Sequence, residues 1–261
     1  MLEGFEMGLM PSTHIVPNSN MGESFGLHSF GNDDELLALI YTANVACGFH
    51  AGDPSGMRTT LTKAAAGISV GAHPGLPDLV GFGRGEMRLT AVEVRDIVRY
   101  QVGALKGFLD AEGIPLDHIK PHGSLYGMFA REDALMDAVC DVALTYGVPL
   151  FGMADTAHER VAELRGIPFV AEFYVDLEYN ALGGLISGRR AQPTSVERAV
   201  KRLPLAIEEG VAIADTGERF PMRFDSVCVH TDAPGQASVA LAIREVLSVR
   251  SMSSRKEPVN V

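Results

Sequence analysis

Residues 41–54 read YTANVACGFHAGDP, and this stretch contains the repeating unit of the fold. Its first part, Tyr41–Gly48, is short and mostly apolar, which predicts a strand that is covered on both faces. Asp53 followed by Pro54 predicts a helix N-cap and a proline at the first helical position. His50 lies in the glycine-containing turn between them. The stretch therefore predicts a β/α unit with a histidine at the carboxyl end of its strand.

The same alternation of short β-rich runs and helical stretches recurs along the chain. Thr90–Glu93 and Thr194–Glu197 both match the capping box that starts a helix, and Asp155 is a further candidate cap. About seven β/α units predict a parallel sheet with right-handed crossovers, either closed as a barrel or open and doubly wound. Residues 215–224 predict a turn between two additional short strands. The seven β-rich runs are His14–Ser19, Tyr41–Gly48, Ile68–His73, His118–Pro121, Pro149–Met153, Phe169–Val175 and Ser226–His230.

Length and composition indicate one domain, residues 13–248, with a loose leader at 1–12 and a flexible tail at 249–261. The formal net charge of −11 argues against nucleic acid and anionic membranes as partners. Three widely spaced cysteines without a CxxC exclude a disulfide framework and a structural zinc finger. No apolar run is long enough to cross a bilayer and the N-terminus does not resemble a signal peptide, so we expect a cytoplasmic protein.

Polar side chains follow six of the seven predicted strands. Because the carboxyl ends of parallel strands converge on one face, we expect these side chains to form a single site. A lone histidine is more often a hydrogen-bonded structural residue, but four histidines on one face favour a shared site. The candidate site residues are Asn18, Asn20, Glu23, Asn44, His50, His73, Lys120, His122, Glu172, His230 and Asp232.

Other residues are given structural or peripheral roles. We expect His14, His28 and His158 at the surface or in caps, and Cys47 as a buried apolar residue. The stretch Pro74–Leu89 is predicted to be a loop over the site, with Arg84 available to contact an anion. Its glycines lack the complete GxGxxG spacing, so a dinucleotide site is not indicated.

Several segments, taken in order, resemble the LamB/YcsF family, the A subunit of the prokaryotic ATP-dependent 5-oxoprolinase. They are NSNMGESFG, YTANVACGFHAGDP, GAHPGLPDLVGFGR, YQVGAL, HIKPHGSLY and CVHTD, and the resemblance extends from about Pro17 to Val246. It implies a distorted, TIM-like, seven-stranded β/α barrel similar to the glycoside hydrolase/deacetylase superfamily. It also implies a hydrolase that opens 5-oxoproline to L-glutamate, using ATP with Mg²⁺. Two further subunits, similar to components of biotin-dependent carboxylase or allophanate hydrolase, would be its partners, and a homo-oligomer stays open.

That chemistry needs a cation for the substrate carboxylate, donors for a developing oxyanion and a base for water. Lys120 and Arg84 are the candidate cations. Asn18, Asn44 and the amides near Gly48–Gly52 are candidate donors. Asn20, Glu172 and His230 complete the predicted substrate- or ATP-binding set, and the candidate acids and bases are His50, His73, His122, Glu23 and Asp232.

The sequence departs from the family pattern at three positions. Asn20 stands where the family's N-x-D-x-G-E motif has Asp, Leu177 replaces an arginine, and Thr231 replaces a glycine. A further family arginine corresponds to Arg189 or Arg190. Two other functions therefore stay open. One is a metal-dependent deacetylase or amidohydrolase with a divalent ion on His50, His73 and His122. The other is a non-catalytic paralogue that binds a small carboxylate ligand or a partner subunit.

Overall fold

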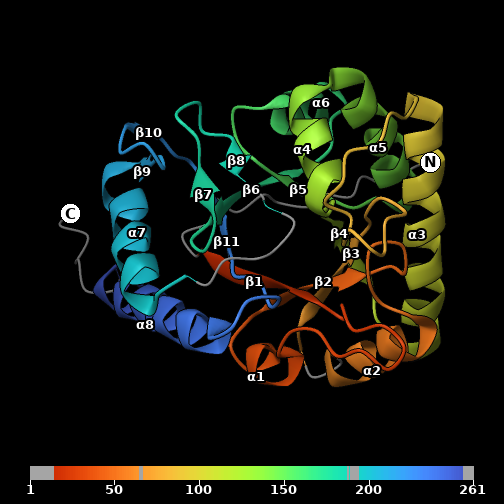
Figure 1. The fold of residues 1–261 in the computed structure, drawn as a ribbon, viewed down its shortest axis with the longest axis horizontal. Helices are drawn as coiled ribbons and strands as arrows, with labels where there is room; N and C mark the ends of the chain where they lie inside the picture. The colour runs from red at the N-terminus through yellow and green to blue at the C-terminus, as the bar shows by residue number, and fades with distance from the viewer. Residues whose placement is uncertain (1–14, 65–66, 187, 189–193, 255–261) are drawn as a thin grey trace, which may run out of the picture.

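Parallel strands close into a barrel at the centre of the structure, a computed structural model that describes residues 15–64, 67–186, 188 and 194–254 (Figure 1). Within these residues seven strands follow each other around the barrel in chain order, and the last closes against the first. Each of the seven β-rich runs contributes one of them, so the seven-stranded parallel barrel is confirmed and the open sheet is excluded. The strands are β1 (Val16–Met21), β2 (Thr42–Ala46), β3 (Ser69–His73), β4 (Leu116–Ile119), β5 (Leu150–Gly152), β6 (Phe169–Tyr174) and β11 (Ser226–Cys228).

The barrel is irregular on one side. Asn18 is paired with Cys228 on one neighbouring strand and with Thr42 on the other, so β1 joins the two ends of the sheet. On the opposite side the register of β3 and β4 shifts, and β4 and β5 share only the pair Ile119–Leu150.

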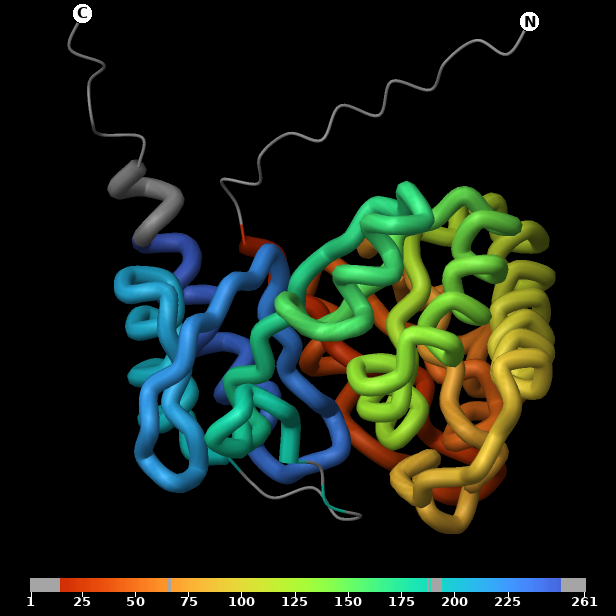
Figure 2. Tube along the Cα trace, turned by 90° about the horizontal axis from the view of Figure 1, so that it is seen from above, coloured from red at the N-terminus to blue at the C-terminus, as the bar shows by residue number. Residues whose placement is uncertain are grey.

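Helices surround the barrel, and two small hairpins are inserted between β6 and β11. In Figure 1, α3 and α5 cover one side and α7 and α8 the opposite side. Figure 2 shows α7 with the β9–β10 hairpin beside it, on the side away from α3. The β9–β10 hairpin confirms the turn predicted at 215–224. In the described part of the chain the helices are α1 (Asp33–Leu37), α2 (Pro54–Ala64), α3 (Ala91–Glu112), α4 (Gly123–Arg131), α5 (Asp133–Tyr146), α6 (Ala157–Leu164), α7 (Val196–Glu209) and α8 (Gln236–Ser254), and the hairpins are β7 (Glu178–Tyr179) with β8 (Leu185–Ile186) and β9 (Val211–Ile213) with β10 (Arg219–Pro221).

The strands are buried on both faces, as predicted, but the two faces differ in chemistry. Outward-facing residues such as Val45, Ile119 and Phe173 belong to the hydrophobic core under the helices. The inward-facing residues alternate with them and are largely polar. Asn18 and Lys120, for example, point into the barrel and make hydrogen bonds to residues of other strands. The interior therefore differs from the apolar side-chain layers that usually fill such a barrel.

Two helix caps lie one residue further along the chain than predicted. Ser195, not Thr194, caps α7, because the Thr194 hydroxyl instead donates to the carbonyl oxygen of Asp176. Thr156, not Asp155, caps α6 by accepting a backbone hydrogen bond from within its first turn. In both cases two neighbouring residues have capping side chains: the contact of Thr194 with Asp176 leaves Ser195 as the cap of α7, and Asp155, with a positive φ of 58°, lacks the extended conformation that Thr156 adopts as the cap of α6.

The predicted leader, residues 1–12, lies outside the described residues. Helix α8 continues to Ser254, into the predicted tail, and residues 255–261 again lie outside the description. Among the described residues no helix combines the length and apolarity required to cross a membrane.

Asp53 caps α2 and fastens a second loop to it, so its replacement should destabilise the fold. The amides of Ser55 and Gly56 donate to its Oδ1, and the Gly26 amide donates to its Oδ2. We expect Asp53→Ala to lower the free energy of unfolding by about 1 kcal/mol, measured by denaturant titration. Asp53→Asn, which keeps an acceptor for the helix amides, should lose less. Equal stability of Asp53→Ala and the unsubstituted protein would show that the cap is not needed.

Candidate active site

A buried lysine lies at the centre of the polar barrel interior. Lys120 Nζ lies 3.0 Å from Asn18 Oδ1, 3.0 Å from Cys228 Sγ and 2.7 Å from Glu172 Oε1. Burial by itself would lower the pKa of Lys120, but the Cys228 sulfur and the Glu172 carboxylate raise it above its ordinary value. An ammonium group has three donors, so these contacts occupy all of them. Binding a substrate carboxylate with Lys120, as predicted from the sequence, requires one of these contacts to break.

The network around Lys120 continues across the barrel. Asn18 Nδ2 donates to Glu172 Oε1 and to Ser226 Oγ, and the Tyr174 hydroxyl donates to Glu172 Oε2. Asn44 Nδ2 donates to the side-chain oxygens of Asn18 and Asn20, which ties β1 to β2.

Four members of this interior were not predicted from the sequence: His118, Tyr174, Ser226 and Cys228. His118 Nε2 lies 2.7 Å from Asn44 Oδ1. His118, Tyr174 and Cys228 each lie two residues along the chain from a predicted site residue, namely Lys120, Glu172 and His230. Inward-facing positions recur with a period of two, so this spacing is the signal that would have identified them.

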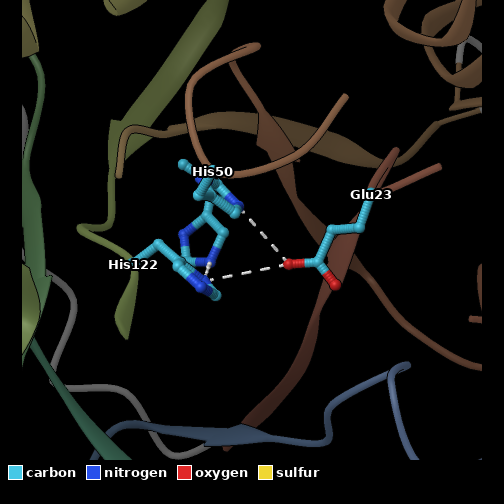
Figure 3. Close-up of side chains that lie close together, drawn as sticks. Glu23, His50 and His122 are labelled. Carbon is cyan, nitrogen blue, oxygen red and sulfur yellow. Dashed lines mark hydrogen bonds and ion pairs between the residues drawn. The ribbon is translucent and has the colours of Figure 1, made fainter. Parts of the chain in front are cut away.

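A second group, the Glu23–histidine cluster, consists of Glu23, His50, His73 and His122 (Figure 3). Its side chains are buried, and one ligand atom from each lies within 4.8 Å of all the others. His50 Nε2 and His122 Nδ1 lie 3.6 and 3.8 Å from Glu23 Oε1, and His122 Nδ1 lies 3.0 Å from His73 Nε2. The rings of His50 and His122 are stacked, with centroids 3.8 Å apart. Three of the four histidines expected to share one site are therefore brought together, whereas His230 lies outside this cluster.

Consecutive units of the barrel supply this cluster. Glu23 follows β1, His50 lies in the loop after β2, His73 ends β3, and His122 precedes the first turn of α4. Gly52 allows the β2 loop to fold back tightly, because its φ is +81° and a Cβ atom would lie 2.9 Å from the Gly22 carbonyl oxygen.

Backbone carbonyl groups orient two of the rings. His73 Nδ1 lies 2.7 Å from the Lys120 carbonyl oxygen, and His122 Nε2 lies 2.8 Å from the Phe82 carbonyl oxygen. Burial is the largest cause that lowers the pKa of His73 and of His122 well below the ordinary value, and the nearby cations Lys120 for His73 and Arg84 for His122 act in the same direction. Both rings are therefore neutral near pH 7.

The loop predicted over the site, residues 74–89, does cover the cluster. The Phe82 ring meets the rings of His50 and His122 edge-on. Phe82 has a positive φ of 54°, a conformation that a non-glycine residue adopts only when its surroundings enforce it. Arg84 donates to Asp232 at 2.5 Å instead of being left without a partner, and this ion pair fastens the loop to the segment after β11.

A cavity of about 930 Å³ opens beside the cluster at the carboxyl ends of the strands. Of the predicted site residues, Glu23 and His50 lie behind its wall, Asn18 and Asn44 lie in the network below it, and Asp232 does not line it. Tyr126 and Tyr174 line it without having been predicted as site residues, and Asp176, one of the polar residues expected at the strand ends, lines it as well. The predicted residues that do line it are Asn20, His73, Arg84, Lys120, His122, Glu172 and His230.

Asp176 and His230 form a hydrogen-bonded pair in the wall of this cavity. His230 Nδ1 lies 3.1 Å from both carboxylate oxygens, and the His230 amide donates to Asp176 Oδ2 at 2.7 Å. Burial alone would lower the pKa of His230, but the charge and hydrogen bonds of Asp176 raise it. Burial would likewise raise the pKa of Asp176, and His230 lowers it. The pair resembles the carboxylate–histidine arrangement that holds a general acid or base in place.

The remaining sequence predictions have mixed outcomes. Cys47 is buried and His28 is exposed, as expected. His158 is not at the surface: it is buried, accepts a hydrogen bond from the Met153 amide at Nδ1, and lies 2.9 Å from the Tyr126 carbonyl oxygen at Nε2. Its position on the inner side of α6 explains the difference.

Two of the residues that depart from the family pattern have defined surroundings. Leu177 packs partly buried against the core, and the Thr231 hydroxyl donates to Glu23 Oε2. His14, Arg189 and Arg190 lie outside the described residues.

Fold and site together define a β/α-barrel protein with its ligand site at the carboxyl ends of the strands. The chain belongs to the LamB/YcsF family, whose sequence profile matches residues 15–259. It is 43% identical over 237 residues to the 5-oxoprolinase A subunit of Tolumonas auensis, covering 88% of this chain and 94% of that one. It is also 43% identical over 235 residues to the lactam utilization protein lamB of Emericella nidulans, covering 88% and 92%. The solved structure of the lactam utilization protein from Thermus thermophilus superposes with a TM-score of 0.83 at 38% identity, covering 92% and 98%.

The buried ion pair gives a stability prediction. Lys120→Met leaves the Glu172 carboxylate buried without its cation, so we expect the free energy of unfolding to fall by about 3–5 kcal/mol. The double substitution Lys120→Met with Glu172→Gln removes both charges and should recover part of that loss. Lys106→Met, at an exposed pair with Asp110 in α3, is the control and should change stability by less than about 0.5 kcal/mol. Equal effects of the two single substitutions in denaturant titrations would contradict this prediction.

The Asp176–His230 pair gives a pH prediction. Because the pKa of His230 is raised in the folded protein, the pair stabilises the fold below the ordinary histidine pKa, and this contribution is lost as pH rises through the raised value. An NMR titration of the ring protons should therefore find His230 protonated to a higher pH than a free histidine. Asp176→Asn should move this midpoint downwards. The same midpoint in both proteins would show that Asp176 does not set the charge of His230.

Proposed function

We propose that this chain is the A subunit of a 5-oxoprolinase. With two further subunits, similar to carboxylase or allophanate hydrolase components, it would open 5-oxoproline to L-glutamate with consumption of ATP. Its relatives are named as the A subunit of 5-oxoprolinase and as a lactam utilization protein, and these names support this substrate class. ATP as the co-substrate and glutamate as the product fit a complex that works in the cytoplasm.

The Asp176–His230 pair is the observation that carries the proposal. Opening a five-membered lactam requires water to add to the carbonyl carbon with loss of a proton, a proton for the nitrogen as the C–N bond breaks, and stabilisation of charge on the carbonyl oxygen. Asp176 holds His230 through Nδ1, which leaves Nε2 for a ligand in the cavity, and the raised pKa favours the protonated ring. His230 is thus suited to give a proton to the leaving nitrogen, with Asp176 stabilising the imidazolium. Arg84 and Tyr126 line the same cavity and are candidate donors to the carbonyl oxygen or the carboxylate.

ATP with Mg²⁺ would supply the phosphoryl group that activates the lactam oxygen. The cavity is far larger than a small lactam requires, and its volume lies at the upper end of the range for small-molecule sites. The sequence contains no GxxxxGK[ST] motif, so we assign the phosphate contacts to side chains of the cavity and to the partner subunits.

Metal-dependent hydrolysis of an amide by the chain alone is a second candidate function. The gathering of Glu23, His50, His73 and His122 favours it, since a bound divalent ion would activate water. A non-catalytic role is a third candidate, motivated by Asn20 and Leu177. At position 20 the side-chain oxygen accepts a hydrogen bond from Asn44, a contact that Asp would preserve.

The three candidates predict different outcomes in one assay, release of glutamate from 5-oxoproline. We expect turnover only when ATP and both partner subunits are present, and we expect His230→Gln to lower kcat by about 10²-fold or more. His28→Gln, at an exposed histidine, is the matched control and should be unaffected. Turnover by the isolated chain with a divalent ion and no ATP would establish the second candidate. No turnover in the complete complex would favour the third.

Asn20→Asp, assayed in the same complex, tests the main departure from the family pattern. A rise in rate of about 10²-fold would show that the unsubstituted chain lacks a base at position 20. Equal rates would show that this position is not catalytic.

A further inference from the structure

The surroundings of the Glu23–histidine cluster fix where its protons lie. A carbonyl oxygen only accepts hydrogen bonds, so His73 carries its proton on Nδ1, facing Lys120, and His122 carries its proton on Nε2, facing Phe82. In the neutral rings the opposite nitrogens, His73 Nε2 and His122 Nδ1, then each present a lone pair. These two atoms lie only 3.0 Å apart. Two lone pairs directed at each other in a buried site are unfavourable unless a cation lies between them.

Glu23 and His50 place further hydrogen-bond acceptors beside these two nitrogens. Glu23 Oε1 is buried, and no hydrogen-bond partner for it exists among the described residues. The fully buried His50 ring likewise has no partner in this part of the chain on either nitrogen. Glu23 Oε1 lies 3.6 Å from His50 Nε2 and 3.8 Å from His122 Nδ1. A buried carboxylate oxygen without a hydrogen-bond donor is rare, and this one faces the ring nitrogens His50 Nε2 and His122 Nδ1.

The spacing of these atoms fits a four-coordinate metal ion. With metal–nitrogen and metal–oxygen distances of about 2.0–2.1 Å, ligand atoms of a tetrahedral site lie about 3.3 Å apart. Three of the six distances among these atoms are 3.0, 3.6 and 3.8 Å, and one ligand atom from each residue lies within 4.8 Å of all the others, so a bound ion would draw the four ligands slightly closer together. Imidazole nitrogens with one carboxylate suit Zn²⁺ and similar divalent transition ions. The carbonyl groups on the far side of two rings are the outer contacts that orient metal-binding histidines.

We propose that Glu23 Oε1, His50 Nε2, His73 Nε2 and His122 Nδ1 bind one divalent transition-metal ion of the Zn²⁺ type, as a structural centre. Four protein ligands complete a tetrahedral shell, whereas catalytic zinc sites keep a position open for water or substrate. Phe82 covers the site from outside. Glu23 is thereby a ligand and not the catalytic base, and the ion joins the loops after β1 and β2 to the ends of β3 and β4. The assignment goes beyond the proposed function and does not depend on which lactam the complex opens, but it excludes the second candidate, in which the same ion activates water.

Metal binding can be measured on the full chain without substrate. Protein stripped with a chelator is titrated with Zn²⁺ by calorimetry and with Co²⁺ by visible absorption. We expect one equivalent to bind, an intense Co²⁺ spectrum typical of four-coordination, and a rise in Tm of about 5–10 °C at 100-fold excess over Kd. No binding of either ion, a six-coordinate Co²⁺ spectrum or an unchanged Tm would overturn the proposal.

Substitutions locate the ion. Glu23→Gln and His50→Gln should each weaken binding about 100-fold or more, because each removes a ligand. The matched controls are Glu86→Gln, at an exposed glutamate, and His158→Gln, at a buried histidine outside the cluster. Both controls should retain one equivalent with unchanged affinity. Equal binding by the cluster variants and the controls would place the ion elsewhere and refute the assignment. Failure of 5-oxoproline hydrolysis would leave these results unaffected, so the two proposals fail separately.

Discussion

The buried ion pair between Lys120 and Glu172 determines which residues can line the interior of the barrel. A charge enclosed by strands must be compensated from several directions, because the Lys120 side chain is almost completely shielded from solvent. Asn18 from β1, Glu172 from β6 and Cys228 from β11 all reach the same ammonium group. These strands are distant in sequence, so the lysine fixes their relative register as the hydrophobic effect alone would not. The inward-facing positions around Lys120 are therefore occupied by polar residues, which complete its hydrogen-bond network.

Lys120 also links this interior to the Glu23–histidine cluster. Its side chain points into the barrel while its backbone carbonyl orients the His73 ring. Residues 23–122 supply the cluster on one wall of the cavity, and residues 172–230 supply Glu172, Asp176 and His230 on the other. The first wall carries the proposed metal ligands, whereas the second carries the proposed proton donor His230. A ligand placed between them would contact both halves of the chain.

Local patterns in the sequence were sufficient to predict the strands and the polar residues at their ends, because burial and the period of two leave a direct trace. Contacts between side chains across the barrel leave no such pattern in the sequence. Nothing in the residues near Lys120 reveals that Cys228 occupies one of its donors, or that Arg84 is bound to Asp232. Tyr174 was overlooked for a different reason, since an aromatic residue in a strand is read as core. The misplaced cap at Thr194 arose because its neighbour Ser195 caps equally well, and only the contact of Thr194 with the Asp176 carbonyl distinguishes them.

The division of the cavity between the two halves of the chain has a consequence for the order of events during synthesis. Translation releases the N-terminal half first, and all four cluster residues together with Phe82 precede residue 123. Strand β11, in contrast, emerges near the end, and until it docks beside β1 neither Cys228 nor His230 is in place. The four proposed metal ligands are therefore synthesised before the segment that carries His230, although Thr231 and Asp232 reach Glu23 and the Phe82 loop only once that segment has docked. The wall that contains His230 is completed only when β11 docks, so a chain truncated before β11 lacks it.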